Sequence, residues 1–228
     1  MTITERSVDM AGDDLVRDWV DGWVVSRGAT PPLVEPWGYT IHVGQAEHPG
    51  RHVLGATNDG VTEDDVRKAA GSTRARAFHL KVFAEPERVL PWLGPEWEPY
   101  GSGDFLMAKG VTAAVVPEVP AGYRLRSWTR SGVTRLLITD TDGSFAARGQ
   151  IALVGASAVV DQIETSEHHR RKGLGTVIMG TLDAAAHAQG ATRAVLACTP
   201  DGRLLYESVG WRIVAPLTNA KHRGSAAA

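Results

Sequence analysis

The chain has 228 residues, of which 43% are hydrophobic and 22% are charged, as is ordinary for a soluble globular protein. A net charge of −2 argues against non-specific nucleic-acid binding, which needs a basic face. No apolar run is long enough to cross a bilayer, and the start of the chain lacks a signal-peptide pattern. A single cysteine, Cys198, excludes an internal disulfide and a cysteine-based metal cluster. We therefore expect a cytoplasmic protein that binds neither nucleic acid nor membranes.

The first part of the chain alternates between helical and strand patterns. Residues 12–27 carry Leu15, Trp19, Val20 and Trp23 at helical spacing, which predicts a helix that packs on a core. The later elements, in chain order, are strands at 39–43 and 51–54 joined by a turn around Pro49-Gly50, a helix at 62–70, a strand at 77–83, an ordered loop with brief helical turns at 85–103, and an apolar segment at 105–108.

A short apolar segment, PEVP at 117–120, marks the expected boundary between two units that pack together. Residues 1–116 would form an N-terminal α/β unit and residues 117–228 a second unit with a clearer pattern. Its elements are strands at 123–130, 133–139, 144–154 and 158–164, a helix from about Leu174 to Gly190, a strand at 194–198, a helix at 202–209 capped by Asp201, and a strand at 211–214. This order predicts an α/β fold of the α+β type, with a mixed, mostly antiparallel sheet flanked by helices.

A basic turn that contains two glycines, HHRRKGLGTVIM at 168–179, joins the fourth strand of the second unit to its long helix. Glycine lets the backbone approach a bulky oxyanion, and the first turn of a helix offers unpaired N–H donors. The neighbouring arginines and lysine add positive charge. The turn matches neither the dinucleotide fingerprint nor the P-loop. It predicts a diphosphate site, although a Gly-x-Gly before a helix is common and basic turn residues are often only solvated.

With its elements in this order, the stretch 122–215 resembles the core of the GNAT superfamily of N-acetyltransferases. The acetyl-CoA signature of that family (Gln or Arg, two residues, Gly, one residue, Gly or Ala) is present as RRKGLG at 170–175. A second family feature, a tyrosine shortly before Gly-Phe or Gly-Trp, is present as Tyr206 ahead of Gly210-Trp211. Each motif alone is weak, whereas the two together, separated by a helix and a strand, are fairly specific.

The sequence departs from the family pattern in three places. TSE at 165–167 stands where the family often has Val-x-Pro, and Thr199 replaces a frequent asparagine. The family also places two helices between its first and second strands, as walls of the acceptor pocket, and only Ser131-Gly132 stands there. We therefore expect the N-terminal unit to supply these walls, and it could be a degenerate copy of the same fold.

The resemblance implies acetyl-CoA as the donor substrate and no metal. The backbone at the end of the fourth strand would pair with the pantetheine arm, and N–H groups of the glycine turn would bind the diphosphate. A main-chain N–H of that strand could also polarise the thioester carbonyl. The implied cofactor-binding residues are Ile163, Glu164, Thr165, Arg170, Arg171, Lys172, Gly173, Leu174, Gly175 and Thr176.

The resemblance also makes Tyr206 the candidate general acid, because a phenol can protonate a departing thiolate. Asp161 is the candidate for steering or deprotonating the acceptor amine. Regular alternation would put Asp161, Ile163 and Thr165 on one face of the strand, whereas a β-bulge would change the faces and favour Glu164. The structural alternatives are a tyrosine packed at a helix–sheet seam and an exposed acid at a strand edge.

The predicted function is direct transfer of an acetyl group from acetyl-CoA to an amine in a ternary complex. The acceptor would be a small-molecule or protein amine, and the sequence is compatible with a homodimer. Two alternatives stay open: an acyl-CoA-binding sensor or interaction module without turnover, and a longer acyl donor. Less specific expectations are an inert buried thiol at Cys198, exposed turn residues at His168 and His169, and either acceptor-pocket lining or loop packing for Trp92, Trp97 and Tyr100.

Overall fold

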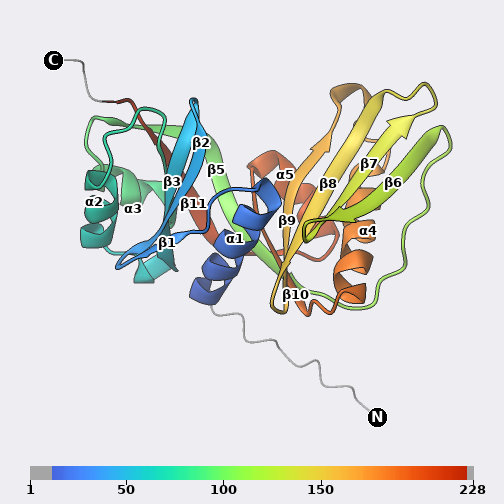
Figure 1. Cartoon of the computed structure of the whole chain (residues 1–228), viewed down its shortest axis with the longest axis horizontal. Helices are drawn as coiled ribbons and strands as arrows, with labels where there is room; N and C mark the ends of the chain where they lie inside the picture. The colour runs from blue at the N-terminus through green and yellow to red at the C-terminus, as the bar shows by residue number, and fades with distance from the viewer. Residues whose placement is uncertain (1–11, 225–228) are drawn as a thin grey trace, which may run out of the picture.

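One long, mixed sheet runs through the protein (Figure 1). The computed structural model describes residues 12–224; residues 1–11, where the sequence lacks a signal-peptide pattern, and residues 225–228 lie outside that range. Eleven strands follow the order β1-β2-β3-β4-β11-β5-β10-β9-β8-β7-β6. They are β1 (Leu33–Glu35), β2 (Gly38–Gln45), β3 (His48–Thr57), β4 (His79–Phe83), β5 (Trp97–Gly110), β6 (Tyr123–Arg130), β7 (Val133–Asp140), β8 (Phe145–Val154), β9 (Ser157–Thr165), β10 (Arg193–Cys198) and β11 (Arg212–His222).

Helices cover both faces of this sheet. In residues 12–224 they are α1 (Gly12–Arg27), α2 (Glu63–Gly71), α3 (Pro86–Val89), α4 (Leu174–Ala188) and α5 (Pro200–Ser208), with short 3-10 turns η1 (Asn58–Gly60), η2 (Leu90–Trp92) and η3 (Glu167–His169). Alternate residues of β5 show the two faces, because Leu106 and Ala108 pack with α1 whereas Met107 packs with α4. None of these helices is long and apolar enough to span a bilayer.

The expected amphipathic pattern of α1 is confirmed, and it places this helix over the middle of the sheet. Leu15, Trp19 and Trp23 are buried in the core under α1. Gly22 permits the close approach, since a Cβ there would lie 2.1 Å from Cγ2 of Val159 on β9. The C-terminal end of α1 therefore lies beside β9.

The sheet contains two parallel βαβ units, β3-α2-β4 and β9-α4-β10, and every other neighbouring pair of strands in the described sheet is antiparallel. β5, which precedes the expected boundary at 117–120, pairs with β10 of the following half. β11, near the end of the chain, pairs with β4 of the first half. Each half of the sheet thus contains a strand from the other.

Two expectations for the N-terminal half are wrong in detail. The β2–β3 turn lies at residues 46–47, and Gly50 lies inside β3 opposite His42. A Cβ at Gly50 would lie 2.5 Å from the Phe78 ring, so this glycine serves a close packing contact. The loop expected at 85–103 ends earlier, because β5 begins at Trp97. Glycines near a bulge between β5 and β11 gave residues 97–103 the composition of a loop.

Two boundaries near the end of the chain also differ. Thr199 is the N-cap residue of α5, and Asp201 lies inside its first turn. The last strand extends to His222, well beyond residue 214, because its second part pairs with both β4 and β5. The fold class itself, a mixed and mostly antiparallel sheet flanked by helices, is as predicted.

Candidate active site

The glycine turn opens a cavity at the start of α4. Arg171 and Gly173 have φ angles of 57° and 76°, so the chain makes two left-handed steps before the helix begins. Gly173 is the N-cap residue, and no side chain caps the helix. The first turn of α4 therefore keeps N–H groups available for an anion. A cavity of about 370 Å³, the turn cavity, is lined by Thr165, Arg170, Arg171, Gly173, Leu174, Gly175, Thr176, Asp201 and Leu205.

The three basic residues of the turn point to different places. Arg170 and Arg171 line the turn cavity. The ammonium of Lys172 lies 6.0 Å from the centre of the Tyr123 ring, and Lys172 does not line that cavity. Gly175 has a packing role, because a Cβ there would lie 2.8 Å from Cδ2 of Leu205 on α5.

β9 and β10 separate next to this turn. They pair as parallel strands only from Ser157 to Val159 on β9, opposite Arg193 to Val195 on β10. Beyond that point lies the splay cavity, of about 910 Å³, which shares Thr165 and Arg170 with the turn cavity. Its lining residues are Arg27, Val160, Asp161, Gln162, Ile163, Glu164, Thr165, Arg170, Leu196, Ala197, Cys198, Thr199, Pro200, Asp201, Gly202, Leu204, Leu205 and Tyr206. The edge of β9 that faces β10 is thus open for an extended ligand.

Tyr206, on α5, lines the splay cavity and is only 8% exposed. Its ring packs edge-on against Trp211, with the ring centres 6.2 Å apart. The Tyr206 side chain therefore both packs at the helix–sheet seam and lines the cavity. Its hydroxyl makes no hydrogen bond to a described residue. Burial raises the pKa of Tyr206, and Cys198 and Asp161 raise it further, so the phenol keeps its proton at neutral pH.

A β-bulge in β9 determines which face of the sheet the two candidate acids lie on. Asp161 lies opposite Gln150 and Glu164 lies opposite Arg148, so two residues of β9 face the single residue between them on β8. Gln162 takes a φ of 55° at this point. Asp161 and Glu164 therefore share the face that carries α1.

The alternative with a β-bulge is confirmed, so the face expected from regular alternation, with Asp161 beside Ile163 and Thr165, is wrong. A Cβ built on Gly149 would meet Ile163 and Ile178 at 2.5 Å, so Ile163 points toward α4. The extra residue of the bulge shifts the alternation by one position, which period-two reasoning on an unbroken strand does not include.

Asp161 is held by α1. Arg27 donates from Nε to Oδ2 at 2.5 Å and from Nη2 to Oδ1 at 2.8 Å, and Ser26 Oγ donates to Oδ2 at 2.7 Å. Only 12% of the Asp161 side chain is exposed, so it is not a solvated edge acid. Glu164 is half exposed and pairs with Arg148 at 2.8 Å.

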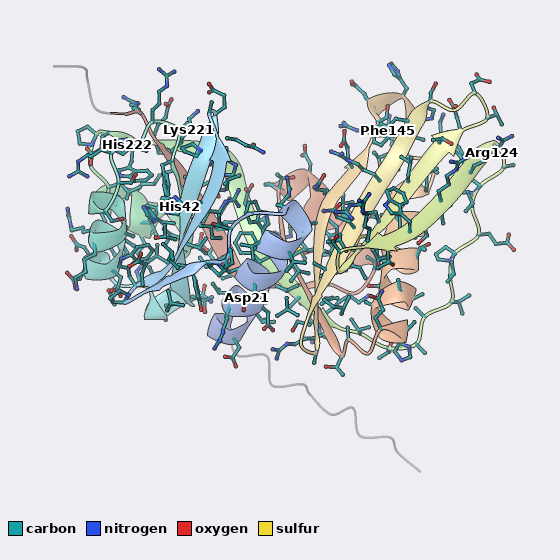
Figure 2. The ribbon with its side chains drawn as sticks, in the orientation of Figure 1. Asp21, His42, Arg124, Phe145, Lys221 and His222 are labelled. Atoms are coloured by element: carbon teal, nitrogen blue, oxygen red, sulfur yellow. The ribbon has the colours of Figure 1, made fainter. Side chains whose placement is uncertain are left out.

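A third cavity, the polar cavity of about 340 Å³, adjoins the splay cavity on the α1 side. The two share Asp161, Cys198 and Thr199 among their lining residues. Its lining residues are Trp19, Trp23, Arg27, His48, Arg51, His79, Lys81, Tyr100, Asp104, Val160, Asp161, Ala197, Cys198, Thr199 and Leu217. Figure 2 shows His42 and Lys221 in the half of the molecule that contains β2 and β11, and Arg124 and Phe145 in the other half.

Sequence reasoning missed most of the polar cavity. His79 and Lys81 alternate with buried residues on β4, and this placement of polar side chains on one face of a buried strand is a signal that the sequence offers. Burial, together with the nearby Arg51, lowers the pKa of Lys81 to about 7. Burial also lowers the pKa of His48 to about 4 and that of His79 to about 3, with the nearby cations acting in the same direction.

The remaining expectations have mixed outcomes. Tyr100 lines the polar cavity, whereas Trp92 and Trp97 pack in the core beneath α2 and α3. Burial raises the pKa of the Cys198 thiol to about 12, which agrees with an inert thiol. His169 is not an exposed turn residue, because its Nδ1 lies 2.9 Å from the Tyr123 hydroxyl. No group of three or more His, Cys, Asp or Glu in residues 12–224 is arranged to hold a metal ion.

Comparison with known proteins identifies one part of the chain directly. Residues 105–211 match the model of the Acetyltransferase (GNAT) family. No curated protein matches the chain significantly. A GCN5-related N-acetyltransferase from Kribbella flavida is similar in structure with a TM-score of 0.70, at 19% identity over 95% of this chain and 97% of that one.

Other solved structures share the arrangement of both halves. A tandem GNAT protein from the clavulanic acid biosynthesis pathway has a TM-score of 0.56, at 14% identity over 96% of this chain and 98% of its own. A GCN5-related N-acetyltransferase-like protein from Streptococcus suis has a TM-score of 0.58, at 14% identity over 92% and 96%. At these identities the structural likeness shows the fold, and the family model adds the family. Residues 105–211 therefore form a domain of the GNAT acetyltransferase family, which confirms the family predicted from the sequence.

Proposed function

We propose that this protein is an N-acetyltransferase that moves the acetyl group of acetyl-CoA directly to an amine held in the same complex. The observation that carries the proposal is a continuous channel. The turn cavity begins at the uncapped start of α4, and the splay cavity continues from it to Tyr206. A GNAT domain at 105–211 supports the same chemistry.

The residues along this channel fit the donor. The N–H groups of the first turn of α4, with Arg170 and Arg171, would bind the diphosphate. Lys172 would add only long-range charge, because its side chain lies over Tyr123. The open edge of β9 at Ile163, Glu164 and Thr165 would pair with the amides of the pantetheine arm.

The proposed reaction breaks one C–S bond and forms one C–N bond. The neutral amine attacks the thioester carbonyl, and a main-chain N–H of β9 stabilises the oxyanion. The departing thiolate takes a proton from Tyr206, whose raised pKa keeps the phenol protonated until that step. Water takes the proton that the amine loses, and Tyr206 regains a proton from water.

Asp161 is the preferred carboxylate for holding the amine. It lies on the wall shared by the splay and polar cavities, whereas Glu164 lines only the splay cavity and is tied to Arg148. Because Arg27 and Ser26 occupy the oxygens of Asp161, the carboxylate would act by orienting and attracting the amine, with water as the immediate proton acceptor.

We propose that the N-terminal half is a degenerate GNAT-like half that forms the walls of the acceptor pocket. The matching βαβ units support this, as do the residues that α1, β3 and β4 contribute to the polar cavity. One observation favours the competing interpretation, an acyl-CoA-binding module without turnover: Asp161 has no free oxygen to receive a proton.

Titration calorimetry with acetyl-CoA, followed by thiol release with a panel of amines, tests the proposal. We expect donor binding and release of one thiol per acetylated amine. Tight binding with no turnover on any amine would establish the module instead, and absence of binding would overturn both. A series of donors with longer acyl chains distinguishes acetyl from longer groups.

A further inference from the structure

The polar cavity contains a buried guanidinium without a carboxylate partner. Arg51, on β3, is 7% exposed and lines the cavity, yet it forms no salt bridge within residues 12–224. Nη2 donates to Nε2 of His48 at 3.0 Å, and the guanidinium carbon lies 3.7 Å from the centre of the Trp23 ring. Nε has no hydrogen-bond partner among the described residues. Buried charges are usually paired, so this arginine lacks an anion.

The other charges of the cavity have partners. Arg27 is paired with Asp161. Lys81 Nζ donates to Oδ1 of Asn219 at 2.6 Å, and Nδ2 of Asn219 donates to Oδ2 of Asp104 at 2.8 Å, so Asn219 joins this lysine to this carboxylate. Both carboxylates of the cavity therefore have other hydrogen-bond partners, whereas Arg51 has no anionic partner among the described residues.

The side chains next to Arg51 supply no anion. His48 and His79 pack edge-to-face with their ring centres 4.4 Å apart, and His79 Nδ1 lies 2.5 Å from the Tyr100 hydroxyl. The pKa of each histidine is lowered, first by burial and then by the surrounding cations, so both rings are neutral at pH 7 and neither adds nor balances charge. The wall around Arg51 therefore consists of one fixed cation and neutral donors.

The two signs of charge occupy different parts of the sheet. Arg51 is on β3, and its guanidinium carbon lies 3.7 Å from the centre of the Trp23 ring, the same ring that Arg27 lies over at 5.7 Å. Asp104 is on β5, directly beside β10, and its Oδ1 is buried without a hydrogen-bond partner. Asp161 is on β9, the other neighbour of β10. Asp161 thus lies on the wall shared by the two cavities, whereas Asp104 and Arg51 line only the polar cavity.

We infer that the acceptor is a small amine that also carries an oxyanion, a carboxylate or a phosphate. Arg51 binds the oxyanion through the planar fork of its guanidinium, with Lys81 and Tyr100 as additional donors. The ammonium end then lies toward Asp104 and Asp161, next to the splay cavity. A volume of about 340 Å³ admits a small molecule and is at the lower end of ligand pockets. This inference rests on the proposed function, since it identifies the substrate class of the same site.

The test compares matched amines with and without the oxyanion. Calorimetry in the presence of CoA measures binding of 4-aminobutyrate against butylamine, and of phosphoethanolamine against ethanolamine. We expect one oxyanionic member to bind at least about 30-fold more tightly than its neutral partner. The arm with the larger difference identifies carboxylate or phosphate. Equal binding within both pairs would overturn the inference.

Variants assign the effect to Arg51. Arg51→Gln should remove about 30-fold or more of the preference for the oxyanion while leaving CoA affinity unchanged, which also reports that the protein is folded. Arg51→Lys should recover only part of the preference, because an ammonium lacks the fork. Arg67→Gln, at an exposed arginine on α2, is the matched control and should change nothing. An undiminished preference in Arg51→Gln overturns the role of Arg51.

The two proposals fail in distinguishable ways. Oxyanion binding that depends on Arg51, without thiol release from acetyl-CoA, supports the anion site and overturns the acetyltransferase. Thiol release with all amines alike supports the acetyltransferase and overturns the anion site. A second readout is the side-chain NMR of His48 and His79, whose pKa values should rise when an anion binds beside them.

Discussion

The donor side and the acceptor side of the proposed site lie on either side of β10, and they are built in different ways. The donor side is formed by the end of β9, the glycine turn and α5, which come from two short stretches at residues 160–176 and 196–206. The acceptor side gathers side chains from α1, β3, β4, β5 and β11, spread over residues 19–217. The first depends mainly on backbone geometry and the second on side chains.

This difference explains why only one side has a sequence motif. The N–H groups at the start of α4 belong to the backbone, so they are present with almost any side chains. The turn requires only that Gly173 can adopt a positive φ and that Gly175 can approach Leu205. Such demands leave a fixed spacing in the chain. The acceptor side has no such spacing, because its residues meet only through the pairing of distant strands.

The largest expected effect tests the role of Tyr206 on the donor side. Tyr206→Phe removes the proposed proton donor, so turnover should fall about 100-fold or more while the Kd for acetyl-CoA changes by less than about twofold. Stopped-flow thiol release and calorimetry measure the two quantities. Tyr123→Phe, which removes a hydroxyl bound to His169 outside the channel, is the control and should keep its turnover. Unchanged turnover in Tyr206→Phe would remove this residue from the mechanism.

The second effect tests whether the turn acts through its backbone. Gly173→Ala forces a Cβ into a left-handed conformation at φ 76°, which should weaken acetyl-CoA binding about tenfold and cost about 1 kcal/mol of unfolding free energy. Gly190→Ala is closely matched, with a φ of 88° and no atom within 4 Å of the new Cβ. We expect it to lose similar stability and to bind acetyl-CoA normally. Equal loss of affinity in both variants would contradict a local role for the turn.

The third effect compares the two acids that the bulge places on one face. Asp161→Asn should lower kcat/KM about tenfold, because it removes the charge at the junction of the cavities. Glu164→Gln should stay within about twofold, since Glu164 is half exposed and paired with Arg148. Steady-state kinetics with a saturating donor measures both. The reverse order would make Glu164 the acting carboxylate.

The smallest effect concerns how the stability of the protein depends on pH. Burial lowers the pKa of His52 on β3 to about 4, below its ordinary value of 6.5. Between these values the unfolded chain binds a proton that the folded chain does not, so stability is lost as the pH falls through this window. The contribution of His52 is at most about 1.4 kcal/mol per pH unit.

Urea unfolding at pH 7, 6, 5 and 4 measures this slope. His52→Phe should reduce this slope. The variant removes the ring that Thr40 and Ser72 bond, but Thr40 keeps Glu35 and Ser72 keeps the carbonyl of Ala69 as a hydrogen-bond partner. His48 and His79 contribute in the same direction, so part of the slope remains. A slope unaffected by His52→Phe would show that this histidine titrates normally in the folded chain.

The sequence predicted the fold class and most element boundaries, because alternation and helical spacing reflect local geometry, and two motifs carried the resemblance to the family. It also singled out Gly173 and Gly175, which line the turn cavity, and Tyr206, which lines the splay cavity. It left a bulge in β9 open and could not decide whether one forms, since an extra residue on β9 depends on the pairing of β9 with β8. It could not predict that Arg27 holds Asp161 either, because 134 positions separate these residues along the chain.

The exchange of β5 and β11 between the two halves of the sheet has a consequence for how this chain must be treated. Removing either half would strip a central strand from the other and expose long rows of unpaired peptide groups. The molecule should therefore unfold as one cooperative unit. A donor bound near α4 would then also stabilise the distant wall that holds Arg51. Coenzyme binding and acceptor recognition share a single folding equilibrium.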